Sequence, residues 1–239
     1  MIKYDSFEKM IELADACDED AMVAAIQEIV WQENYEVELT PEIHKKLIKY
    51  LKNAFELGNI DVLNQLGAMF AEGRMVEKDL KKAFMFYKMA DACGNMLSTS
   101  NLGFCYLYGL GTDKDYEKAY KAFSKAALCE YGEAMIRVAD MYCGGLYVEK
   151  DQSYGHLLYY RSMTLAEKDL TDWGNIQVYS DACKKIADIY YYGNGTIKNY
   201  ELAKKYYQEA LKYYEIRNNL NDAYSYDSYV AVKRNLETL

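Results

Sequence analysis

The chain has 239 residues, of which 51% are hydrophobic and 27% are charged, a composition typical of a folded globular protein and unlike that of a disordered or fibrous one. Its 28 lysines and arginines stand against 37 aspartates and glutamates, which gives a formal net charge of −9. Because nucleic acids and anionic membranes are bound by clusters of basic side chains, this balance argues against either as the main partner.

The sequence contains no stretch suited to crossing a bilayer, since the longest nearly apolar run, residues 21–30, is interrupted by Gln27 and Glu28. The first residues also lack the apolar core of a secretory signal, so we expect a soluble, cytoplasmic protein. Six cysteines occur without a Cys-x-x-Cys pair, and only His44 and His156 accompany them. We therefore expect reduced thiols that behave as small hydrophobic residues, no metal site and no cofactor.

The N-terminal region, residues 1–59, is predicted to hold a lone helix followed by a degenerate two-helix repeat. The predicted helices are residues 6–17, 18–32 and 42–57. Thr40 is a preferred residue for capping the third helix, and Pro41 suits its first turn, where a backbone amide hydrogen is not needed.

Four copies of one pattern follow between residues 60 and 214. Each copy is anchored by an apolar residue that a small residue follows, and the anchors are Leu66, Leu102, Val138 and Ile186. Counting from the anchor, an aromatic residue stands at +4, glycine at +7, Asp or Asn at +13, a small residue at +17, an aromatic residue at +21 and a small residue at +24. The first three anchors are 36 residues apart and the fourth follows after 48, which places a 12-residue insertion at residues 167–178.

Each column of this pattern has a physical interpretation. The anchor and the aromatic residue at +4 share one helical face, and the glycine suits a left-handed helix end. The Asp or Asn caps a second helix, whose small and aromatic positions form one buried stripe. Such a hairpin cannot bury its apolar face alone, so neighbouring hairpins must stack. With residues 215–239 as a closing helix, the chain is predicted to be an all-α, α/α right-handed superhelical solenoid of about twelve helices in one continuous domain.

The second copy reads Leu-Gly-Phe-Cys-Tyr-Leu-Tyr-Gly-Leu-Gly over residues 102–111 and continues with Asp115. This motif resembles the Sel-1-like repeat, a branch of the tetratricopeptide-like solenoids, and the resemblance covers roughly residues 61–214. It implies a non-enzymatic scaffold or adaptor that binds other proteins. In two copies the second glycine of the loop is replaced, by Met75 and by Tyr147, so we expect those hairpin turns to differ.

The sequence shows no catalytic motif. Gly109-x-Gly111 and Gly193-x-Gly195 follow helices and lack the Gly-Lys-Ser/Thr of a phosphate-binding loop, so we interpret them as hairpin turns. His156 could serve a cysteine as a base, but we interpret it as one more residue of a second helix. Two alternatives to a scaffold stay open: an immunity or antitoxin-type protein that sequesters a basic partner, and an enzyme or small-molecule binder with a pocket near Trp173.

The candidate binding surface is the face of each first helix that lies opposite its anchor, at offsets of −5, −2, +2, +5 and +6. In the tetratricopeptide-like arrays that the chain resembles, this face forms a concave groove. The selected residues are Asp61, Asn64, Glu72, Ser100, Phe104, Tyr108, Asp140, Asp181, Lys184, Asp188, Tyr191 and Tyr192. Acidic and aromatic side chains predominate, so we expect the groove to hold a basic peptide or protein segment that carboxylates attract and tyrosines anchor. Alternatively, the acids only keep the array soluble. If they attract the partner, changing Asp140, Asp181 and Asp188 to asparagine is expected to slow its association.

Overall fold

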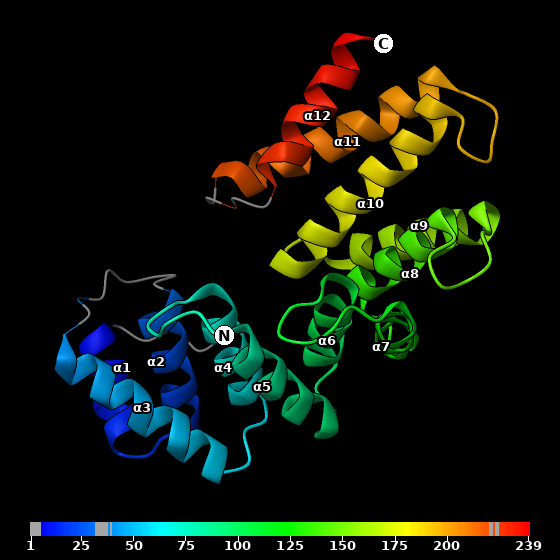
Figure 1. The fold of residues 1–239 in the computed structure, drawn as a ribbon. Coiled ribbons are helices and arrows are strands. Elements are labelled where there is room, and N and C mark those ends of the chain that lie inside the picture. Colours follow the sequence, from blue (N-terminus) through cyan, green and yellow to red (C-terminus); the bar gives the residue numbers. More distant parts are fainter. Residues whose placement is uncertain (1–5, 32–37, 39, 220–221, 223–224) are drawn as a thin grey trace. The chain divides into compact units, whose positions relative to one another are not determined.

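The computed structural model describes residues 6–31, 38, 40–219, 222 and 225–239 (Figure 1). Within these ranges the chain forms twelve α-helices and one short 3-10 helix, and it contains no strand. The all-α prediction is therefore confirmed. The chain divides into two compact units, residues 1–114 and 115–239. The single continuous array stays a prediction.

The first unit consists of six helices. They are α1 (Phe7–Asp15), α2 (Glu19–Trp31), α3 (Pro41–Glu56), α4 (Asp61–Glu72), α5 (Leu80–Ala92) and α6 (Met96–Tyr108). Helices that follow one another in the chain pack side by side. The core between α1, α2 and α3 contains fully buried side chains such as Met22, Ile26 and Tyr50. The three predicted N-terminal helices are found, and Thr40 caps α3 by accepting a hydrogen bond of 3.3 Å from the amide of Ile43.

The second unit also consists of six α-helices and includes the 3-10 helix. They are α7 (Tyr116–Leu128), α8 (Gly132–Gly144), α9 (Gln152–Ala166), η1 (Glu167–Asp169), α10 (Trp173–Tyr192), α11 (Tyr200–Asn219) and α12 (Tyr226–Glu237). Again, helices adjacent in the chain pack on one another, and the core between α10, α11 and α12 contains Tyr207, Tyr214 and Val232. The predicted closing helix is α12.

The insertion at residues 167–178 forms η1 and then the first turns of α10, which has 20 residues compared with 13 in α8. The following helix, α11, is equally long at 20 residues. The added turns pack on each other, with the rings of Tyr179 and Tyr213 in an edge-on contact at 5.0 Å between centroids. The insertion therefore lengthens the last hairpin.

The helix ends of the four copies follow the sequence pattern closely. The residue at +13 caps the second helix with its side chain in every copy, and these residues are Asp79, Asp115, Asp151 and Asn199. The glycine at +7 ends the first helix in the left-handed conformation, and these residues are Gly73, Gly109, Gly145 and Gly193, with φ between 67° and 76°. Both predicted roles are confirmed.

The hairpin loops do not differ in the way that we expected. Met75 and Tyr147 have φ values of 60° and 69°, close to the 73° and 69° of Gly111 and Gly195 at the same loop position. The prediction of a different turn is wrong because the surrounding loop holds this position in the left-handed region whichever residue occupies it. A side chain there carries a conformational cost that glycine avoids.

The small residue after each anchor permits close packing within the hairpin. In the first copy, a Cβ on Gly67 would lie 2.5 Å from a ring carbon of Tyr87, the aromatic residue at +21. The Tyr87 ring therefore lies directly against the backbone of α4 at Gly67. This contact explains why a glycine in one column and a large aromatic residue in another occur together.

All six cysteines are free thiols. Cys105 and Cys183 are buried and Cys143 is partly buried, as expected of small hydrophobic residues. The expectation fails for the other three, which are exposed next to helix C-termini: Cys17, Cys93 and Cys129. At the end of a helix the side chain extends past the last packed turn, so the apolar character of the thiol does not determine its burial.

Candidate functional site

In the first unit, the candidate residues Asp61 and Asn64 bind α6 and its N-terminal cap. The side-chain amide of Asn95 donates a hydrogen bond of 2.7 Å to Asp61. The Ser98 hydroxyl and the Asn101 amide donate to the Asn64 side-chain oxygen at 2.8 and 2.9 Å. These bonds fix the position of α6 against α4.

The other polar candidates of this unit differ in their exposure. Glu72 is exposed at the end of α4 and forms an ion pair with Arg74, with a distance of 2.8 Å from the guanidinium Nε. Ser100 is fully buried, and its hydroxyl has no hydrogen-bond partner among the residues that the structure describes. Glu72 can therefore meet a ligand at the surface, whereas Ser100 cannot.

Phe104 and Tyr108 form an aromatic surface on α6. Their rings are one helical turn apart and nearly parallel, with 6.2 Å between centroids and 7° between planes. The Tyr108 side chain is 57% exposed, and Phe104 is partly buried. A flat, partly exposed aromatic pair of this kind is suited to contacts with apolar or cationic side chains.

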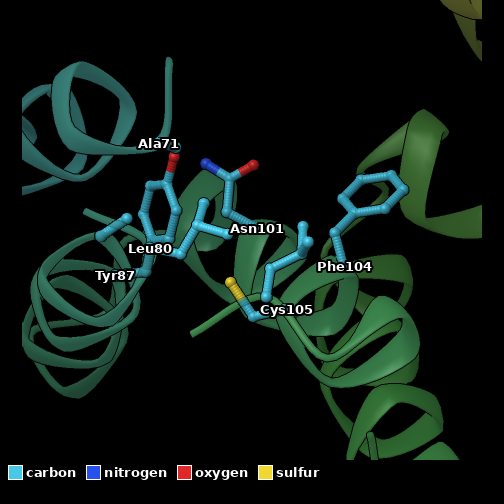
Figure 2. Close-up of a pocket in the computed structure, with 8 residues that line it drawn as sticks. Ala71, Leu80, Tyr87, Asn101, Phe104 and Cys105 are labelled. Carbon is cyan, nitrogen blue, oxygen red and sulfur yellow. The ribbon is translucent and has the colours of Figure 1, made fainter. Parts of the chain in front are cut away.

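A cavity of about 130 Å³ lies next to this aromatic pair. Figure 2 shows its walls, which come from α4, α5, α6 and the loop that follows α6: Ala71, Leu80, Ala83, Tyr87, Asn101, Phe104, Cys105 and Leu110. The Tyr87 hydroxyl and the Asn101 amide, both from lining residues, point the same way. The remaining walls are mostly apolar, so the cavity combines an apolar interior with two polar groups.

In the second unit, the candidate acid Asp140 of α8 has three partners within the protein. Its carboxylate accepts hydrogen bonds from the Tyr159 hydroxyl at 2.6 Å and from the Lys185 ammonium at 2.5 Å, and it pairs with Arg137 at 3.1 Å. The negative charge of Asp140 is therefore compensated inside the unit.

Asp188 of α10 is held in the same way. It accepts from the Tyr207 hydroxyl at 2.6 Å and pairs with Lys184, another candidate residue, at 2.9 Å. The side-chain amide of Asn235 donates to the Tyr207 oxygen at 2.8 Å. A continuous chain of hydrogen bonds thus connects α12, α11 and α10.

Asp181 belongs to a buried ionic network at the lengthened end of α10. It accepts from the Tyr214 hydroxyl and from Arg217, each at 2.8 Å. Arg217 is only 4% exposed and also pairs with Asp222 at 2.7 Å. Nearby, burial raises the pKa of Glu133, and the charge of Asp181 acts in the same direction.

Tyr191 and Tyr192, at the C-terminal end of α10, pack with their rings edge-on at 4.8 Å between centroids. The Tyr191 hydroxyl lies 2.8 Å from the hydroxyl of Thr238, just after α12. Tyr192 is 51% exposed. Of this pair, Tyr192 has the larger surface available to a ligand.

Negative charge is concentrated in the first unit. Residues 1–114 contain 12 Lys and Arg against 19 Asp and Glu, a net −7, whereas residues 115–239 contain 16 against 18, a net −2. Sequence reasoning did not find the compensating partners in the second unit, namely Arg137, Tyr159, Lys185, Tyr207, Tyr214 and Arg217. One signal was present: Asp at +2 and Tyr at +21 occur together in the third and fourth copies.

The titrating groups do not resemble an activated catalytic set. Burial raises the pKa of the Cys105 thiol to about 11 and that of Cys183 to about 12, which is opposite to the lowering that activates a nucleophilic cysteine. Burial lowers the pKa of His156, whose Nε2 has no hydrogen-bond partner among the described residues. Trp173, which marks the ligand pocket of the enzyme or small-molecule-binder alternative, is the first residue of α10 and is 36% exposed.

The part of the chain that the structure describes contains no group of three or more His, Cys, Asp or Glu side chains arranged to hold a metal ion. None of its helices is both long and apolar enough to span a membrane.

Hairpins with capped second helices and glycine-ended first helices define a helical repeat protein. The Sel1 repeat family model matches residues 60–95, 98–131, 132–162 and 180–214, more than half of the chain. The protein therefore belongs to the Sel1 repeat family, whose members generally mediate protein–protein interaction. No curated protein sequence matches the chain.

Solved structures show the same architecture. A Sel1 repeat protein from Oxalobacter formigenes has 27% identity and a TM-score of 0.62, over 76% of this chain and 70% of that one. A protective antigen of uropathogenic Escherichia coli strains has 18% identity and a TM-score of 0.59, over 98% of this chain and 56% of that one. An immunity protein from Pseudomonas aeruginosa has 16% identity and a TM-score of 0.53, over 88% and 81%. The last two similarities concern the fold alone.

Proposed function

We propose that this protein is a non-enzymatic scaffold that binds a basic segment of another protein through the face containing Phe104 and Tyr108. The observation that carries the proposal is the parallel aromatic pair itself, which is partly exposed and adjoins a cavity. Exposed aromatic surface beside a cavity is typical of sites where a partner places an anchoring side chain.

The preference for a basic segment rests on the first unit's net charge of −7, from 12 Lys and Arg against 19 Asp and Glu, and on its exposed acids Asp61 and Glu72. A field of one sign attracts an oppositely charged partner and speeds its association. The acids of the second unit contribute less, because Asp140, Asp181 and Asp188 are compensated by tyrosine and basic side chains. Changing these three to asparagine would break internal networks, so it is a poor test of charge steering.

The proposal is tested by affinity capture with the full chain and two matched variants. One variant combines Phe104→Ala with Tyr108→Ala on α6. The control combines Met85→Ala with Met89→Ala, which removes exposed apolar side chains from α5. We expect a partner that is captured by the wild type and the control and is lost with the aromatic variant, although that variant stays folded by circular dichroism.

Purified partner and purified protein must then bind each other, with an affinity that falls as salt concentration rises. Equal capture by both variants would show that the aromatic pair is not the binding face. Binding that does not depend on salt would show that the partner segment is not selected for its basic charge. A partner that is toxic when produced alone and harmless when produced with this chain would favour the immunity-type alternative. That alternative has the structural likeness to the Pseudomonas aeruginosa immunity protein in its favour, and the likeness extends to the fold only.

A further inference from the structure

The cavity beside α6 has the size of one side chain. Its volume of about 130 Å³ is well below the roughly 300–1,000 Å³ typical of sites for drug-sized ligands and metabolites. It is close to the roughly 150 Å³ of an engineered apolar cavity that accepts a single benzene molecule. The walls formed by Leu80, Phe104 and Leu110 are apolar. The dimensions and the lining therefore suit one aromatic ring or one branched aliphatic group.

Tyr87, in the wall of the cavity, lacks the partner that its counterparts have. At the same repeat position, Tyr159 and Tyr207 each donate a 2.6 Å hydrogen bond to an aspartate at +2. In the first copy the +2 residue is Ala68, and the Tyr87 hydroxyl has no hydrogen-bond partner among the described residues. Tyr87 is 7% exposed, and burial raises its pKa, so its hydroxyl stays protonated and able to donate.

A carboxylate lies near the polar end of the cavity, that of Glu72, which is ion-paired with Arg74. The Glu72 carboxylate is close enough to Tyr87 to add to the rise of its pKa. The Asn101 amide nitrogen is already used in a bond to Asn64, which leaves the Asn101 carbonyl oxygen to accept a hydrogen bond. An incoming peptide would therefore find a hydroxyl donor, a carbonyl acceptor and a carboxylate beside an apolar opening.

We propose that this cavity is the anchor socket of the scaffold: it takes one large apolar side chain, Leu, Met or Phe, from a peptide segment that carries Lys or Arg within a few residues of it. The apolar side chain fills the space between Leu80, Phe104 and Leu110. Tyr87 donates to a backbone carbonyl of the segment, and the basic residue pairs with Glu72 in competition with Arg74. This inference deepens the proposed function and depends on it.

The test uses a phage library of random 12-residue peptides selected on the intact chain, followed by affinity measurements with synthetic peptides of the enriched sequences. Ala71→Leu fills the socket from its α4 wall, and Ala92→Leu adds the same side chain at the end of α5, outside the lining. Ala71 is partly exposed and Ala92 is exposed, so neither change disrupts the buried core. A third variant, Phe104→Ala, enlarges the socket.

We expect the enriched peptides to share one apolar residue near a Lys or Arg. Ala71→Leu should weaken their binding about tenfold or more, as losing the burial of one large side chain does, whereas Ala92→Leu should change it less than about twofold. Selection on Phe104→Ala should shift the apolar residue toward Trp.

Three results would overturn the socket. If the peptides bind by charge alone, with equal affinity for the wild type and Ala71→Leu, the socket proposal is wrong. The proposal of a scaffold for a basic segment would remain. If no peptide is enriched on the intact chain, the socket proposal is wrong. The affinity-capture experiment tests the scaffold function independently of that result. Concentration-dependent dimerisation abolished by Ala71→Leu would show that a second copy of the chain occupies the cavity.

Discussion

The Tyr207 hydroxyl donates a hydrogen bond of 2.6 Å to the carboxylate of Asp188, 19 residues earlier in the chain. Tyr159 and Asp140 form the same bond with the same separation and the same distance. In both copies the aspartate is at +2 and the tyrosine at +21, so the bond is a property of the repeat. It connects the two helices of a hairpin where the first copy has only Ala68.

The first prediction concerns this bond. Tyr207→Phe should lower the free energy of unfolding by about 1.5–3 kcal/mol, because a fully buried tyrosine loses a hydrogen bond to a charged group. Tyr200→Phe removes a hydroxyl from a side chain that is 53% exposed and should change stability by less than about 0.5 kcal/mol. Urea unfolding measures both variants. Equal free energies of unfolding for Tyr207→Phe and the wild type would mean that the bond does not stabilise the protein.

The second prediction concerns the loop after α6. Gly111 has a φ of 73°, and a Cβ there would lie 1.9 Å from the Leu80 carbonyl oxygen. Gly111→Ala should therefore cost at least about 2 kcal/mol, from the left-handed backbone and the forced displacement together. Gly144→Ala, on a helix with open space around the site, should be neutral or stabilising by up to about 1 kcal/mol. Thermal unfolding of the two alanine variants tests the contrast, and a cost below about 1 kcal/mol at Gly111 would contradict the loop geometry.

The third prediction concerns the buried ionic network. Arg217→Met should destabilise the protein by about 3–5 kcal/mol, because it removes a buried cation that pairs with both Asp181 and Asp222. Arg161 forms an ion pair with Glu130 at the surface, so Arg161→Met should cost less than about 1 kcal/mol. Because the Arg217 ion pairs are largely shielded from solvent, adding salt to the wild-type protein should not lower its stability by a similar amount. A cost at Arg217 no larger than at Arg161 would argue against a buried network.

The fourth prediction concerns His156 and pH. Burial lowers the pKa of His156 below its ordinary value of 6.5, so as pH falls the unfolded chain binds a proton before the folded protein does. The folded state therefore loses stability below about pH 6.5, and this continues down to the folded pKa. His156→Gln should remove that part of the pH dependence: the stability difference between variant and wild type should be constant above pH 7.5 and shift toward the variant below pH 6. A difference independent of pH would refute this account.

The sequence alone was sufficient to predict the repeat and its local geometry. Glycine at +7 and Asp or Asn at +13 determined where helices end and begin, because left-handed backbone and helix capping depend on one or two residues and their immediate neighbours. The Met75 and Tyr147 loops show the limit of this reasoning. There the packed loop imposed the backbone conformation in spite of the residue's own preference.

Tertiary structure decided the character of the candidate face. The sequence placed Asp140, Asp181 and Asp188 on a face expected to be acidic, but residues 19 to 45 positions away along the chain supply the hydroxyls and two of the four cations that compensate them. Such partners meet only once helices have packed, because the helical period gives the direction of a side chain within its own helix and not its distance from a neighbouring one. For the same reason the fully buried position of Ser100 and the cavity beside Phe104 became visible only in the folded chain.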